Sequence, residues 1–176
     1  DELIKKEADL YLPRDFTPNG WVMHTIKDNL LIPTAGIDLS NANNFYILWP
    51  QNSKKAAEEI RIFFRDKFNL KDFGVIITDS HSVPLRRGAV GVTLGFAGFN
   101  PLKDYRGGKD IFGREFTVEI SNLADMLAST AVLMMGEGAE QSPAALISDV
   151  PFIEFVENYK EPNKPFSKFS VPIEED

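Results

Sequence analysis

The stretch from residue 87 to residue 98 constrains the fold more than any other part of this sequence. Large apolar residues alternate there with small ones, in the order Val90, Gly91, Val92, Thr93, Leu94, Gly95, Phe96 and Ala97. A strict period of two predicts a β-strand with one large apolar face. The opposite face is nearly bare, which predicts that another stretch of backbone or a ligand approaches it closely.

Two helices are also predicted. The first spans residues 53–68, with Ser53 as its N-cap. Its apolar residues recur at helical spacing, and charged residues that include Arg61 occupy the opposite face. The second helix begins near Asn122, which can cap it, and ends at Gly136.

The remaining apolar runs favour short strands over residues 21–26, 29–32, 45–49, 73–78, 112–120, 144–148 and 152–156. Residues 1–20 combine charges with Pro13 and Pro18 and predict no defined element. Strands therefore outnumber helices and do not alternate regularly with them. This pattern favours an α+β fold, with mixed or antiparallel sheets and a few packing helices, over a doubly wound parallel fold.

Composition excludes several classes of protein. A length of 176 residues suits one domain, or one domain with a small subdomain. The absence of cysteine excludes a thiolate nucleophile and cysteine-based metal sites, and it fits a reducing cytoplasm. The net charge of −7 and the pI of about 4.9 make nucleic acid a poor partner. No signal peptide and no apolar run of membrane-spanning length is present, so we expect a cytoplasmic protein without a membrane partner.

The sequence has no phosphate-binding P-loop, no Gly-x-Gly-x-x-Gly turn and no Gly-x-Ser-x-Gly elbow. Four oxygen-bearing side chains instead stand in loop-like positions: Asp38, Asp79, Ser80 and Glu137. Carboxylates and hydroxyls are the ligands that Mg²⁺ and Mn²⁺ prefer, and those ions hold phosphate oxygens. The same residues also fit an Asx turn, a strand-end turn and a solvated charge, and spacing alone leaves both interpretations open.

A basic set follows along the chain and comprises Arg86, Arg87, Arg106, Lys109 and Arg114. Arginine binds phosphate and carboxylate in bidentate fashion, so these residues could form an anion site in an acidic protein. Ordinary surface charge, paired with neighbouring acids, is the simpler reading, and composition favours it. His81 is either an acid–base group beside Asp79 or a plain polar residue.

Several blocks occur in a fixed order between residues 30 and 150. They are Ala35-Gly36-Ile37-Asp38-Leu39-Ser40-Asn41, Thr78-Asp79-Ser80, Pro84-Leu85-Arg86-Arg87-Gly88, Leu94-Gly95-Phe96-Ala97-Gly98, Asp104-Tyr105-Arg106-Gly107, Gly113-Arg114-Glu115 and Met135-Gly136-Glu137-Gly138. This succession resembles the F420-0:γ-glutamyl ligase family. Several blocks in the right order are far more specific than any single one.

The resemblance implies a fold like that family's and an intertwined homodimer. It implies an enzyme that joins L-glutamate to the lactyl-phospho end of F420-0, with GTP, two Mg²⁺ or Mn²⁺ ions and an acyl-phosphate intermediate. Asp38 and Asp79 would hold one metal ion, and Ser80 and Glu137 the other, where many members have Gln in place of this Glu. The residues implied to contact the nucleotide are Asn41, Gly136 and Gly138, and the implied catalytic cations are Arg86, Arg106 and Arg114. The bare face of the strand at residues 91–97 would let a substrate or a partner subunit pack tightly.

Two departures leave alternatives open. Ser82-Val83 stands where the family usually has Gly-Arg before the proline, so the acceptor could instead be a folate. Lys5-Lys6-Glu7-Ala8 resembles only faintly an N-terminal nucleotide-contacting segment, which favours a third interpretation, a non-catalytic nucleotide- or metal-binding member. We therefore divide the chain into a remnant of an N-terminal region at 1–29, a ligase-like core at 30–157, and a C-terminal segment with an acidic tail at 158–176.

Overall fold

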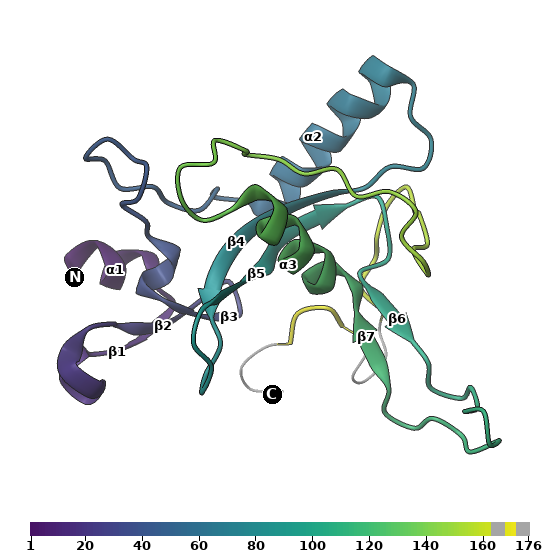
Figure 1. Cartoon of the computed structure of the whole chain (residues 1–176), viewed down its shortest axis with the longest axis horizontal. Helices are drawn as coiled ribbons and strands as arrows, with labels where there is room; N and C mark the ends of the chain where they lie inside the picture. Colours follow the sequence, from purple (N-terminus) through teal and green to yellow (C-terminus); the bar gives the residue numbers. More distant parts are fainter. Residues whose placement is uncertain (163–167, 172–176) are drawn as a thin grey trace.

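A computed structural model describes residues 1–162 and 168–171 (Figure 1). Its centre is a long antiparallel hairpin formed by β4 (Val75–Ser82) and β5 (Ala89–Ala97). Ile77 pairs with Gly95 and Thr78 pairs with Thr93, so Leu94 is an extra residue in β5. This β-bulge interrupts the alternation predicted for the strand, although the strand itself is confirmed.

Two helices, α2 (Ser53–Phe68) and α3 (Leu123–Met135), pack against this hairpin. A Cβ atom added at Gly91 would lie 2.4 Å from the carbonyl oxygen of Ala128, and one added at Gly95 would lie 2.4 Å from the carbonyl of Ser53. The predicted close backbone is therefore present, and it belongs to helices of the same chain. The expectation that a substrate or a partner subunit packs on these two glycines is wrong.

The bounds predicted for both helices are confirmed, with one change of cap. Asn52, not Ser53, caps α2, because its side chain accepts a hydrogen bond from the backbone N–H of Lys55. Asn122 caps α3 by accepting from the backbone N–H of Asp125 at 3.0 Å. Gly136 ends α3 with a φ of +82°, a conformation that favours glycine.

The face of α2 that packs inward differs from the prediction. Arg61 is only 5% exposed, and its guanidinium donates to the carbonyl of Phe73 at 2.9 Å and to the carboxylate of Glu157 at 3.1 Å. Phe63, on the predicted apolar face, is 56% exposed. A charged residue can be buried at little cost when its donors are satisfied, and the helical pattern cannot reveal those partners.

The N-terminal part forms a separate small sheet beside the hairpin. Helix α1 (Glu2–Glu7) and strand β1 (Leu10–Leu12), which the sequence did not predict, precede β2 (His24–Lys27) and β3 (Leu30–Pro33). The three strands pair antiparallel in the order β1-β2-β3, and 3-10 turns follow β1 and β3. Ile4, Met23 and Ala35 form its core. The boundary proposed at residues 29 and 30 falls in the turn between β2 and β3.

Four predicted strands are wrong. Residues 45–49 form only a single bridge, between Ile47 and Asp38. Residues 112–119 belong to the long connection of a short hairpin, β6 (Leu102–Asp104) with β7 (Ile120–Asn122). Residues 144–148 and 152–156 contain no strand, and only Phe155 makes a bridge, to Phe99. An apolar run becomes a strand only where another strand offers backbone hydrogen bonds, and that condition is not local.

A second core forms beneath the central hairpin. Phe96, Phe99 and Ala124 are buried together, and Tyr159 and Phe169 from the C-terminal segment pack on them. The rings of Tyr159 and Phe169 each lie 5.1 Å from the ring of Phe96. The tail predicted at residues 174–176 lies outside the described residues.

Much apolar surface stays uncovered. The accessible area is 12,844 Å², whereas a folded monomer of 19.7 kDa is expected to expose about 8,600 Å². Exposed apolar residues gather on α2, on the β6–β7 connection and at residues 45–48. No helix in the described part of the chain is long and apolar enough to cross a membrane.

Candidate functional site

Asp79 and Ser80 lie inside β4 and not after it. The strand continues to Ser82, so the prediction that these residues follow the strand is wrong. Neighbouring residues of a strand point to opposite sides of the sheet. The side chains of Asp79 and Ser80 therefore contact different partners.

Asp79 is half-buried, and each oxygen of its carboxylate accepts one hydrogen bond. Its Oδ2 accepts from the indole Nε1 of Trp49 at 2.6 Å, and its Oδ1 accepts from the backbone N–H of Ser80 at 2.8 Å. Burial raises the pKa of Asp79 above its ordinary value, although these two donors oppose the rise. The nearby carboxylate of Asp38 raises the pKa further.

Asp38 lies in the loop that follows β3. Its Oδ1 accepts from the backbone N–H groups of Leu39 and Ser40 at 2.6 and 2.8 Å, and its Oδ2 accepts from the hydroxyl of Ser40 at 2.5 Å. Burial acts to raise the pKa of Asp38, but these donors outweigh it and hold the pKa below its ordinary value. The Asx turn considered from the sequence is therefore present, and it holds the carboxylate ionised beside Asp79.

The other side of the site joins β4 to the loop after α3. The hydroxyl of Ser80 donates to Oε2 of Glu137 at 3.0 Å. The amide of Asn41 donates to the carbonyl of Gly138 at 2.9 Å, and the N–H of Gly138 donates to Glu140. We call the set Asp38, Asn41, Asp79, Ser80, Glu137 and Gly138 the carboxylate region. The carboxylate region thus joins segments that are about 40 to 100 residues apart in the sequence. Gly136, which the resemblance implied to contact the nucleotide, ends helix α3 and is not part of this set.

The carboxylate region offers two pairs of hard oxygen ligands. Asp38 and Asp79 interact electrostatically, and Ser80 and Glu137 are hydrogen-bonded. Within residues 1–162 and 168–171, no three His, Cys, Asp or Glu side chains are close enough to form a complete metal cage. Each of the two pairs, Asp38 with Asp79 and Ser80 with Glu137, nevertheless fits Mg²⁺ or Mn²⁺, because these ions are commonly bound by one or two carboxylates plus substrate phosphates and water.

The three predicted catalytic arginines lie elsewhere, on what we call the arginine-bearing turns, residues 83–88 and 105–119. Arg86 is exposed in the turn between β4 and β5. Arg106 donates to Asp104 at 2.6 Å, and this carboxylate raises the pKa of Arg106. Arg114 is exposed on the β6–β7 connection, which extends away from the central hairpin (Figure 1). Within the described residues, neither Arg86 nor Arg114 forms an ion pair with a carboxylate.

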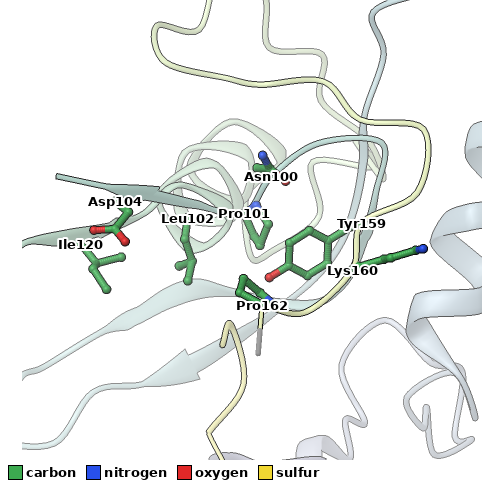
Figure 2. Close-up of a pocket in the computed structure, with 8 residues that line it drawn as sticks. All are labelled: Asn100, Pro101, Leu102, Asp104, Ile120, Tyr159, Lys160 and Pro162. Carbon is green, nitrogen blue, oxygen red and sulfur yellow. The ribbon is translucent and has the colours of Figure 1, made fainter. Parts of the chain in front are cut away.

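A cavity of about 240 Å³ lies apart from these residues, between the β6–β7 hairpin and the C-terminal segment (Figure 2). Its lining includes Pro101, Leu102, Ile120, Tyr159 and Pro162. Burial, reinforced by Glu161, raises the pKa of Tyr159 to about 12. That phenol therefore stays protonated at neutral pH.

The family model for F420-0:Gamma-glutamyl ligase matches residues 5–149. The chain belongs to the F420-0:γ-glutamyl ligase family. The resemblance seen in the ordered blocks is thereby confirmed.

Curated relatives support the same assignment. The Coenzyme F420:L-glutamate ligase of Methanopyrus kandleri is 36% identical over 148 residues, which is 82% of this chain and 56% of that protein. The protein of the same name from Methanococcus maripaludis strain S2 is 38% identical over 134 residues, covering 76% of this chain and 53% of the relative. The chain spans about half the length of the curated relatives it matches.

Sequence reasoning missed one residue of this region, Trp49. It ends the aromatic run at 45–49, which predicted a strand and no role in the site. Its contact partner Asp79 is 30 residues away, so spacing could not reveal the hydrogen bond. The sequence feature that comes closest to indicating a role for Trp49 is Gly36, because a glycine inside a loop often marks a place where another group approaches the backbone closely.

Proposed function

We propose that this chain provides the metal-binding part of a ligase that attaches L-glutamate to F420-0 by an amide bond. GTP would supply the energy and Mg²⁺ or Mn²⁺ would assist. The observations that carry this proposal are the hydrogen bond between Ser80 and Glu137 and the electrostatic interaction between Asp38 and Asp79. These are the same pairings that the family blocks imply for two metal ions. Membership of the family supports the reaction class.

The reaction needs a carboxylate to be turned into a good leaving group. In the first step a carboxylate oxygen of F420-0 attacks the γ-phosphorus of GTP, which forms an acyl phosphate and releases GDP. In the second step the amine of glutamate attacks the acyl carbon, inorganic phosphate leaves, and the amine loses a proton. Neither step needs a nucleophile from the protein, which agrees with the absence of cysteine.

The residues of the carboxylate region would have distinct roles in this reaction. Bound divalent metal would neutralise phosphate charge and align the phosphoryl group. Asp38, held ionised by its three donors, and Asp79 would hold one ion, and Ser80 with Glu137 the second. Asn41 ties its loop to Gly138 and would shape the edge of the nucleotide site.

The arginines and the exposed apolar faces support assembly as a homodimer. Arg86 in the turn between β4 and β5 and Arg114 on the β6–β7 connection are exposed, so they could reach a substrate or a second copy. The excess of accessible area over that of a typical monomer indicates surfaces that another chain would cover. We propose that Arg86, Arg106 and Arg114 act on substrate charge in the complete assembly.

A second candidate is ligation of glutamate to a folate by the same chemistry. Ser82 and Val83, at the end of β4 and the start of its turn, replace the Gly-Arg usual in the family. Loss of a cation there would weaken recognition of a phosphorylated acceptor. This departure favours an acceptor with less phosphate than F420-0.

A mass-spectrometric transfer assay tests both candidates. The chain is incubated with Mn²⁺, L-glutamate and either GTP or ATP, and F420-0 and tetrahydrofolate are offered in parallel. An adduct one glutamyl residue heavier on F420-0, lost in Asp79→Ala, supports the leading proposal, and the same adduct on folate supports the second. Nucleotide and metal binding without either adduct would support the non-catalytic interpretation and contradict both.

A further inference from the structure

Trp49 holds the Asp79 carboxylate although it belongs to none of the family blocks. Its indole Nε1 donates to Oδ2 at 2.6 Å, while the other oxygen accepts from the Ser80 backbone N–H. Each carboxylate oxygen therefore has one donor and keeps a lone pair for a cation. We propose that Trp49 is a positioning residue that orients the Asp79 carboxylate for a divalent metal ion. This inference rests on the proposed function.

The indole ring itself is fixed from two sides. A Cβ atom added at Gly36 would lie 2.2 Å from the indole Nε1, so no other residue at position 36 leaves room for the ring in this place. The ammonium of Lys27 lies 5.4 Å from the ring centroid, within cation–π range. Glu7 holds that ammonium at 2.9 Å, and the Lys27 side chain is only 11% exposed.

The backbone that carries Trp49 is also tied to the second carboxylate. Ile47 and Asp38 exchange two backbone hydrogen bonds, of 3.1 and 2.9 Å. The same short segment thus sets the place of Asp38 through its backbone and the orientation of Asp79 through Trp49. This coupling gives the segment at residues 45–49, in which residues 45–48 are exposed, a role that its packing does not explain.

A packing role and a positioning role make different demands on the side chain. Packing against Gly36 and Lys27 needs only the aromatic ring, whereas positioning needs the indole N–H. Trp49→Phe keeps a ring and removes the donor, and hydrogen bonds of this kind to a ligating carboxylate typically change metal affinity by 10–100-fold when lost. The chain's other tryptophan, Trp21, is exposed and makes Trp21→Phe a matched control.

Calorimetric titration with Mn²⁺ of the wild-type chain and both variants tests the inference. We expect Trp49→Phe to bind Mn²⁺ about ten-fold more weakly and Trp21→Phe to bind it as the wild type does. If the wild type binds Mn²⁺ and transfers glutamate while Trp49→Phe binds with unchanged affinity, the positioning role alone is overturned. A wild-type chain that binds no Mn²⁺ overturns the proposed function together with this inference.

If Trp49→Phe fails to fold, an NMR measurement on the wild-type chain tests the inference instead. The two indole N–H resonances are assigned with Trp21→Phe, and Mg²⁺ is then added. We expect the Trp49 resonance to exchange slowly with solvent and to shift with Mg²⁺, and the Trp21 resonance to do neither. The inference is overturned if the Trp49 resonance exchanges rapidly with solvent. It is also overturned if the resonance does not shift on addition of Mg²⁺ although calorimetry shows that Mg²⁺ binds.

Discussion

The carboxylate region and the arginine-bearing turns hold the predicted site residues in opposite ways. In the first, Asp38, Asp79 and Glu137 each contact a partner inside the chain, drawn from β4 and two distant loops. In the second, Arg86 and Arg114 are exposed at the ends of hairpins. The difference teaches that one chain suffices to bring these oxygen-bearing side chains together, whereas Arg86 and Arg114 are exposed to solvent. Binding of metal and action on substrate charge should therefore be separable by mutation.

The largest effect should come from breaking the scaffold of the carboxylate region. Gly91→Val places a side chain against the backbone of α3, because even a Cβ atom there lies 2.4 Å from the Ala128 oxygen. We expect a loss of about 3 kcal/mol in the free energy of unfolding, measured by urea denaturation. The control is Ala89→Val, on an exposed position of the same strand, with little expected change. Equal stability of the two variants would show that α3 does not lie this close to β5.

A smaller loss of stability is expected at the support of Trp49. Glu7→Gln removes the carboxylate that pairs with the nearly buried Lys27, at a cost of about 1 kcal/mol. The control, Glu2→Gln, breaks an exposed pair with Lys5 on the same helix and should have almost no effect.

The same pair predicts a dependence on pH. Hydrogen bonding and charge from Lys27 lower the pKa of Glu7 below its ordinary value of 4.5. The stabilisation is therefore present above pH 4.5 and is lost as the pH falls through the lower pKa of the folded state. Unfolding measured at pH 7 and at successively lower pH should show the wild type converging on Glu7→Gln. A constant difference would contradict the ion pair.

The arginine-bearing turns should respond in the opposite manner. Arg86→Ala and Arg114→Ala remove exposed side chains, so we expect changes in stability within about 0.5 kcal/mol. Mn²⁺ affinity should stay unchanged, while the rate of glutamyl transfer should fall by roughly a hundred-fold because charge stabilisation is lost. Lys71→Ala, which removes an exposed cation outside these turns, serves as the control. A parallel loss of Mn²⁺ binding in Arg114→Ala would erase the distinction between the two regions.

The smallest expected effect is spectroscopic and lies beside the β6–β7 hairpin. Absorbance titration of the four tyrosines should show one that ionises near pH 12, and Tyr159→Phe should remove that component. Because its pKa is raised in the folded state, Tyr159 contributes stability below pH 10 that is lost between pH 10 and 12. Uniform titration near pH 10 would show that the C-terminal segment does not bury this ring.

The elements that the sequence predicted well are those fixed by local chemistry. Helix α3 begins after Asn122 and ends at Gly136 because a cap and a terminator act within a few residues. The grouping of Asp38 with Asp79 was suggested by resemblance to a family and not by spacing. The fold class was anticipated as small antiparallel sheets with few helices, and the structure agrees.

What the sequence could not predict depends on contacts between distant residues. Arg61 is buried because Phe73 and Glu157 satisfy its donors, and Glu157 lies 96 residues away. Trp49 joins the site because Gly36 and Asp79 leave a place for its ring. Among the described residues, 144–148 pair with no strand and 152–156 make only the bridge from Phe155 to Phe99, so their apolar pattern formed no sheet.

The most direct test of the account is binding of Mn²⁺ in the presence of a non-hydrolysable GTP analogue, followed by calorimetry. The account predicts that the wild type binds Mn²⁺, that Asp79→Asn loses this binding, and that Asp72→Asn, on an exposed position outside the site, keeps it. Equal binding by wild type and Asp79→Asn, or no binding by the wild type, would contradict the claim that the carboxylate region is a metal site.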